Sequence, residues 1–155
     1  MEKTIRMKDI CYYKDGTTSE KWDSSKTPHR EDGPARIKYY KDGAIEYEDY
    51  YVEGKSHRED GPARIGYYKD GSIYYECYYI EDKYHREDGP AIMRYSEDGS
   101  ISYEAYYIEG KYLWKNDYTA LIKEISEMNP TLKLIDNDAW VRKLGKEEYE
   151  SGAER

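Results

Sequence analysis

A set of side chains that could hold an ion or an anionic ligand recurs three times in the chain. The heptapeptide His-Arg-Glu-Asp-Gly-Pro-Ala stands unchanged at residues 29–35, 57–63 and 85–91, so the period is 28 residues. Imidazoles and carboxylates are metal ligands, and guanidinium groups bind carboxylates and phosphates. The candidate ligand residues in these loops are His29, Arg30, His57, Arg58, His85 and Arg86.

Spacing argues against one catalytic or metal site shared by the three loops. Equivalent positions two strands apart in a sheet are separated by about 9.6 Å, whereas a zinc ion needs every ligand at about 2 Å. Identity in three copies is what duplication of a structural turn produces, because Asp and His commonly close loops onto backbone amides. The chain also lacks a nucleophile elbow, a phosphate loop, Cys-x-x-Cys and His-Glu-x-x-His. We therefore expect no catalytic residue, no metal and no cofactor.

A second motif within each period predicts β-hairpins. Tyr-Tyr-Lys-Asp-Gly occurs at 12–16, 39–43 and 67–71, and Tyr-Ser-Glu-Asp-Gly occurs at 95–99. Asp-Gly between alternating apolar residues indicates a hairpin turn. A three-residue loop with a left-handed glycine places the alternating apolar residues of the two strands opposite each other, on one face of the hairpin. In the first unit it pairs Tyr39 with Ile45, Lys38 with Glu46, Ile37 with Tyr47, Arg36 with Glu48 and Ala35 with Asp49. In the later units it pairs Tyr67 with Ile73, Ile65 with Tyr75, Arg64 with Glu76, Ala63 with Cys77, Met93 with Tyr103 and Ala91 with Ala105.

This register predicts one sheet face rich in Ala, Ile and Tyr, and a second face of charge pairs. The chain then folds as a mainly β protein, a single-layer antiparallel meander of about eight strands built from 28-residue hairpins. Gly54, Asp82 and Gly110 share the next turn position, where positive φ is tolerated. Tyrosine is enriched at interface hot spots, and an aromatic patch marks an interface. The predicted partner-binding residues are Tyr39, Tyr47, Tyr51, Tyr67, Tyr75 and Tyr79.

The two ends depart from the repeat. Residues 1–28 contain an eroded unit, interpreted as a degenerate capping repeat, and residues 29–112 hold the three full units. In residues 113–155 the pattern changes to period 3.6 and predicts a small α-helical appendage. Its first helix is capped by Asn116 or Asp117 and runs to about Met128, with Leu121, Ile122, Ile125 and Met128 on one stripe. A second short helix begins at Asp136 or Asp138 and ends at Gly145, before a solvated tail.

Composition limits the classes of function. The 155 residues include 21 Tyr and no Phe, and the formal net charge is −8, so general binding of nucleic acid through phosphates is not expected. No apolar run approaches the length of a transmembrane helix, so we expect no membrane partner. The opening residues lack a secretory core, and two cysteines are too few for a disulfide framework. The expected location is the cytoplasm, or the host cytoplasm if the source is a virus.

The repeat unit Tyr-Tyr-x-Asp-Gly-x-Ile-x-x-Glu-x-Tyr-Tyr-x-x-Gly-Lys-x-His-x-x-Asp-Gly-Pro-Ala resembles the MORN-type repeat over about residues 8–112. It looks most like the variant in YwqK-type antitoxin proteins, and its invariant loop resembles MORN-like arrays of large viruses, phages and some bacteria. The resemblance implies an elongated antiparallel meander that binds proteins or, in some members, membrane lipids. The longer period and the sparse Gly and Trp depart from standard MORN units and argue against the lipid role.

Three functions are compatible with these observations. The first is a non-enzymatic module that binds a protein partner or a second copy and occludes it, as an antitoxin-like or phage anti-defence inhibitor would. The second is recognition of a small anionic ligand or lipid headgroup by the Arg and His loops. The third is an acidic mimic of nucleic acid that blocks a basic protein.

Overall fold

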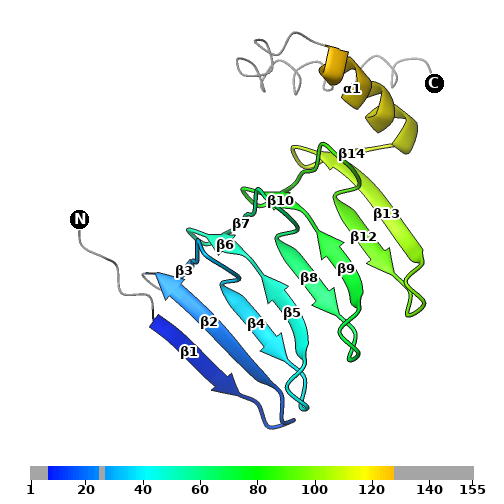
Figure 1. The fold of residues 1–155 in the computed structure, drawn as a ribbon. Helices are drawn as coiled ribbons and strands as arrows, with labels where there is room; N and C mark the ends of the chain where they lie inside the picture. The colour runs from blue at the N-terminus through cyan, green and yellow to red at the C-terminus, as the bar shows by residue number, and fades with distance from the viewer. Residues whose placement is uncertain (1–6, 25–26, 128–155) are drawn as a thin grey trace, which may run out of the picture. The chain divides into compact units, whose positions relative to one another are not determined.

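The computed structural model describes residues 7–24 and 27–127 and confirms a mainly β fold, a single antiparallel meander of hairpins with one C-terminal helix (Figure 1). Among the described residues, eight longer strands follow one another across the sheet in chain order, as predicted. They are β1 (Met7–Tyr12), β2 (Thr18–Ser24), β4 (Arg36–Tyr39), β5 (Ile45–Asp49), β8 (Arg64–Tyr67), β9 (Ile73–Cys77), β12 (Ile92–Tyr95) and β13 (Ile101–Ile108).

Short strands extend the hairpins at the end of the sheet where the heptapeptide loops lie, which we call the loop edge. Three of these hairpins, at Glu53–Gly54, Glu81–Asp82 and Glu109–Gly110, have two-residue turns, and both turn residues have positive φ, 50° and 83° at Glu53 and Gly54, as a type I′ turn requires. Asp82 and Gly110 also have positive φ, so the prediction for this turn position is confirmed. The short strands are β3 (Thr27–Pro28), β6 (Tyr51–Val52), β7 (Lys55–Ser56), β10 (Tyr79–Ile80), β11 (Lys83–Tyr84) and β14 (Lys111–Leu113).

The Asp-Gly turns at the opposite end, the turn edge, have the predicted three-residue loop. The amide of Tyr40 donates to the carbonyl of Ala44 at 2.8 Å, and Gly43 donates back to Tyr40 at 3.0 Å. Gly43 is left-handed, with φ of 88°. The Asp42 carboxylate accepts the Ala44 amide at 3.1 Å, which explains why Asp precedes the glycine.

The register beyond the first pair is not the predicted one. Tyr39 does pair with Ile45, but Lys38 then pairs with Tyr47, because a β-bulge places one extra residue in β5. The same shift occurs between Gly66 and Tyr67 and between Arg94 and Tyr95. The predicted pairs below the bulge are therefore wrong by one residue. The observed pairs include Ile37 with Glu48, Arg36 with Asp49, Ile65 with Glu76, Arg64 with Cys77, Met93 with Glu104 and Ile92 with Ala105.

The bulge also changes which side chains share a face, because cross-strand partners point to the same side. The predicted Ala/Ile/Tyr face is divided between the two sides of the sheet. One side, the glutamate face, carries Ile37, Tyr39, Glu48, Ile65, Tyr67, Glu76, Met93, Tyr95 and Glu104. The other side, the arginine face, carries Arg36, Lys38, Tyr47, Asp49, Arg64, Gly66, Tyr75, Cys77, Arg94 and Tyr103.

The sheet has little dry core. Among the described residues no large side chain is fully buried, and the most buried positions are small ones such as Ala35, Ala63 and Ala91. The alanine carbonyls accept amides of the preceding unit, as Ala63 does from Tyr50 at 2.7 Å. The sheet is thus stabilised by its hydrogen-bond ladder and by partly wet aromatic rings, in agreement with a composition rich in Tyr.

The chain divides into two compact units at the Trp114–Lys115 bond, and the second contains α1 (Lys115–Glu127). The helix begins one residue before the predicted cap at Asn116. On the predicted stripe, Leu121 is buried and Ile122 and Ile125 are half-buried. Met128, the predicted second helix and the tail lie outside the described residues.

Candidate functional site

The arginines of the heptapeptide loops bind within their own loops. The Arg58 Nε donates to Asp60 at 2.8 Å, and its Nη1 donates to the Pro62 carbonyl at 3.3 Å. The guanidinium lies 4.1 Å from the centroid of the Tyr50 ring, a cation–π contact. The hydrogen bond from Arg58 lowers the pKa of Asp60. Arg30 with Asp32 and Trp22, and Arg86 with Asp88 and Tyr78, repeat this arrangement.

The histidines of the same loops join each unit to the next one. Nδ1 of His29 accepts the Glu53 amide at 3.0 Å, and His57 and His85 do the same to the type I′ turns that follow them. These contacts agree with the structural interpretation of the loops, in which His closes onto backbone amides.

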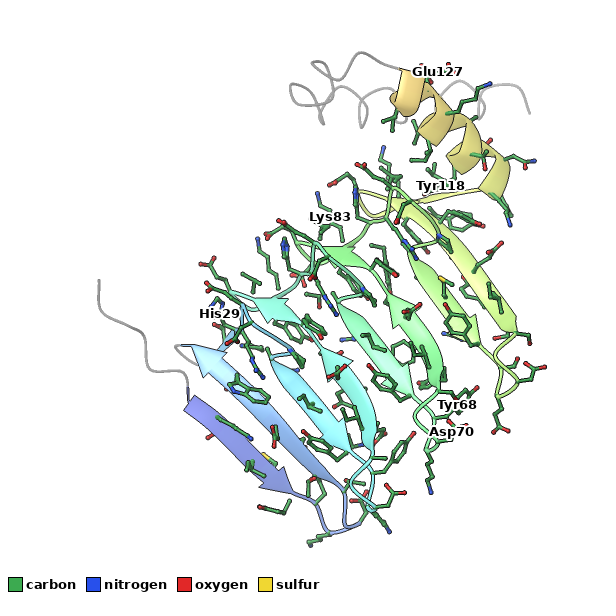
Figure 2. All side chains as sticks on the ribbon, in the orientation of Figure 1. His29, Tyr68, Asp70, Lys83, Tyr118 and Glu127 are labelled. Carbon is green, nitrogen blue, oxygen red and sulfur yellow. The ribbon has the colours of Figure 1, made fainter. Side chains whose placement is uncertain are left out.

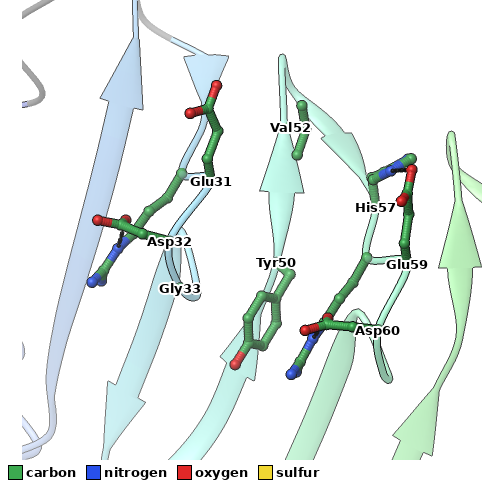
Figure 3. A pocket seen from close by; sticks show the side chains of 10 residues that line it. Glu31, Asp32, Gly33, Tyr50, Val52, His57, Glu59 and Asp60 are labelled. Carbon is green, nitrogen blue, oxygen red and sulfur yellow. Dashed lines mark hydrogen bonds and ion pairs between the residues drawn. The ribbon is translucent and has the colours of Figure 1, made fainter.

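Two equivalent grooves lie between successive loops, with volumes of about 590 and 540 Å³. Figure 3 shows the first groove, where Tyr50 and Val52 lie between the loop of Asp32 and the loop of Asp60. The first groove is lined by Arg30, Glu31, Asp32, Gly33, Tyr50, Val52, His57, Arg58, Glu59 and Asp60. The second is lined by Arg58, Glu59, Asp60, Gly61, Tyr78, Ile80, His85, Arg86, Glu87 and Asp88.

Five aromatic rings in contact form a row at the loop edge, which we call the aromatic strip. Successive ring centroids from Tyr79 through Tyr84, Tyr107 and Tyr112 to Trp114 are 4.3, 5.1, 5.6 and 5.5 Å apart. Tyr79, Tyr84 and Tyr107 are half-buried, whereas Tyr112 is 46% and Trp114 is 70% exposed. Sequence reasoning did not assign Tyr84, Tyr112 or Trp114 to a site. The available signal was an aromatic residue after two of the three turn lysines, at positions 84 and 112.

The six tyrosines predicted to bind a partner do not lie on one surface. Tyr47 and Tyr75 lie on the arginine face by their register, and Tyr51 contacts Arg36 and Arg64 of that face. Tyr79 begins the aromatic strip. The remaining two, Tyr39 and Tyr67, lie on the glutamate face, where the Tyr67 hydroxyl donates to Glu48 at 2.8 Å.

Across residues 7–24 and 27–127, no group of three His, Cys, Asp or Glu side chains is arranged to hold a metal ion. Within the same residues, no helix has the length and apolar character that a membrane crossing requires. Figure 2 shows that polar and aromatic side chains project along the whole sheet. Comparison of the chain with protein-family models, with curated proteins and with solved structures finds no match.

Proposed function

We propose that this chain is a non-enzymatic repeat module that binds a protein partner and occludes part of its surface, in the manner of an antitoxin-like or anti-defence inhibitor. The observation that supports the proposal is the aromatic strip. Tyr and Trp are the residues that most often contribute large binding energies at protein interfaces. A row of five contacting rings ending in two exposed ones presents such side chains in a rigid array, with little ordering required on binding.

The contacts of the heptapeptide loops weigh against the alternative of an anionic ligand. Each loop arginine is hydrogen-bonded to an aspartate and a proline carbonyl and is stacked on a ring. Binding an anion there would compete with bonds that close the loop. The net charge of −8 likewise makes a protein partner a better fit than a nucleic acid.

The partner is identified by affinity capture from the source cells and then purified for calorimetry. Substituting Tyr112→Ser and Trp114→Ser together removes the exposed end of the strip. We expect affinity for the purified partner to fall at least about 100-fold, because two hot-spot residues each contribute about 2 kcal/mol. The matched control is Tyr12→Ser with Tyr13→Ser, which removes two exposed tyrosines, 80% and 50%, from the first hairpin.

Equal affinities for the two double variants would show that the strip is not the binding surface. Sedimentation of the purified chain covers the case in which the partner is a second copy. If the chain is a dimer, the strip variant is a monomer and the control variant remains a dimer, the second copy binds at the aromatic strip.

A further inference from the structure

We propose that the two grooves between the heptapeptide loops hold Lys or Arg side chains of an extended segment of the protein partner, with the basic residues three positions apart. This inference rests on the proposed function only in that the occupant is a protein segment. It concerns a different surface from the aromatic strip.

The first step is the charge of the grooves. Each groove is lined by two arginines and four carboxylates, and the charges of these six side chains sum to −2. The arginines are directed to the aspartates of their own loops. The glutamates reach into solvent, with the side chains of Glu31 and Glu59 70% and 85% exposed. The loop motif that looked like an anion site in the sequence therefore presents the opposite charge.

The second step is the composition of the lining. The floor between two loops is an aromatic ring and an aliphatic side chain, Tyr50 with Val52 in one groove and Tyr78 with Ile80 in the other. Lys and Arg have apolar stems and a charged end. An apolar floor below an acidic rim is complementary to both parts of such a side chain. A small metal cation would use the carboxylates alone and would gain nothing from the floor.

The third step is the spacing. Adjacent grooves are one unit apart, which is two strand spacings or about 9.6 Å. One turn of polyproline II helix contains three residues and spans about 9.3 Å, and it returns the side chain at i+3 to the same side as the side chain at i. In a β-strand, residues three positions apart point to opposite sides, and residues on the same side are about 6.6 or 13 Å apart, so a β-strand does not match the grooves. Basic side chains at positions i and i+3 therefore meet successive grooves.

The test uses fluorescence anisotropy with three labelled nine-residue peptides and the full chain. One peptide has Lys at every third position among Ser and Thr, the second has the same composition with the lysines contiguous, and the third has Glu in place of Lys. We expect the spaced peptide to bind at least about 10-fold more tightly than the contiguous one. Its affinity should also fall as salt is raised, because the contacts are exposed.

Glu59→Lys is the informative variant, because Glu59 lines both grooves. Glu97→Lys makes the same change in net charge at the exposed Asp-Gly turn of the third unit, on the turn edge. Loss of spaced-peptide binding in the first variant and its retention in the second support the inference. Circular dichroism checks that both variants are folded.

Equal binding of the spaced and contiguous peptides, or equal losses in the two variants, would mean general attraction to an acidic protein and would overturn the inference. Absence of binding by every peptide, or binding of the Glu peptide alone, would overturn it too. The proposed function is judged separately, with the purified partner. If the partner binds the Glu59→Lys variant normally but does not bind the strip variant, the proposed function is supported and the role of the grooves is not.

Discussion

The first hairpin, β1 with β2, and the three repeat hairpins share one turn but differ in their strands. In the first hairpin the pairing runs unbroken from Tyr12 with Thr18 to Met7 with Asp23. Every repeat hairpin instead has a bulge one step from its turn. The bulge is one added residue. Six positions separate Gly16 from Trp22, whereas seven separate Gly43 from Tyr50, the ring in the equivalent place.

The first hairpin and the repeat hairpins also differ at the residue that faces the preceding unit. Ala35, Ala63 and Ala91 are at most 1% exposed, because the preceding unit packs against them. The equivalent residue of β1 is Lys8, which ion-pairs with Glu20 at 2.8 Å. A charged residue on an edge strand prevents a further strand from adding. We therefore expect the first hairpin to protect this edge of the sheet.

Exchanging the residues at this position should have the largest effect. Ala63→Lys places a charge in the junction between two units, and we expect it to cost on the order of 3–5 kcal/mol and to unfold the array. Lys8→Ala removes only a surface ion pair, so its cost should stay below about 1 kcal/mol. Urea denaturation followed by circular dichroism measures both changes.

Lys8→Ala has a second expected outcome, association. With the lysine gone, β1 is free to pair with the outer strand of another copy, so sedimentation should become concentration-dependent. A variant that remains monomeric at every concentration would show that Lys8 does not protect the edge.

Alkaline pH should unfold the repeats. Burial, and then the hydrogen bond to Glu76, raise the pKa of Tyr95 from 10.0 to about 12, and burial raises the pKa of Tyr67 and Tyr75 as well. Since the folded pKa exceeds the unfolded one, this stability is complete below about pH 10 and is lost as pH rises towards 12. Tyrosinate absorbance and circular dichroism should change together. Tyr95→Phe should raise the midpoint and Tyr13→Phe in the first hairpin should not. Tyrosinate formation with unchanged dichroism would contradict this.

Much of the fold was predictable because period, turn residues and strand order are local signals. The three-residue loop at Asp42-Gly43 and the positive φ of Asp82 follow from residue type. The strand register was not predicted correctly, because the alternation of apolar and polar residues in the sequence does not reveal a β-bulge. One signal existed: the turn motif is offset by 27 residues from 12 to 39 but by 28 from 39 to 67.

The candidate site was less predictable than the fold. Residue type suggested that Arg58 was a ligand, but its partners, the ring of Tyr50 and the carbonyl of Pro62, are set by a loop conformation that no spacing rule describes. The rings of Tyr84 and Tyr112 lie on strands of two and three residues, too short for periodicity to detect.

The two cysteines should report the same contrast between regions. Cys77 is buried in the second repeat, and burial raises its thiol pKa to about 11, whereas Cys11 is exposed on the first hairpin. Each pH unit below a thiol's pKa reduces its reactive thiolate tenfold, so Cys77 should be alkylated at least about 100-fold more slowly than Cys11. Mass spectrometry of the iodoacetamide reaction measures both rates. Similar rates would mean that the repeat sheet opens easily.

Gly66 should be sensitive because of the bulge in its own hairpin. A Cβ at Gly66 would overlap the rings of Tyr74 and Tyr75, which the bulge brings to the same side. We expect Gly66→Ala to cost about 1–3 kcal/mol through overpacking. Lys38 holds the same register position in the first unit, opposite Tyr47, so Lys38→Ala is the matched control and should be nearly neutral. A neutral Gly66→Ala would show that the tyrosine rings can move aside.

The smallest effect should come from making the first hairpin more like a repeat. Trp22 and Tyr50 occupy equivalent places, with a loop guanidinium over each ring at 4.3 and 4.1 Å. Trp22→Tyr keeps the ring, the arginine above it and the backbone bond from His29, which donates to the carbonyl of residue 22 at 3.1 Å. Trp interacts somewhat more strongly with cations than Tyr, so the cost should be below about 1 kcal/mol. Trp22→Ala removes the ring altogether and should cost more than the conservative change. If the two substitutions cost the same, the arginine–ring contact contributes nothing at this junction, and the equivalent contacts in the repeats would be expected to stabilise their loops through the hydrogen bonds alone.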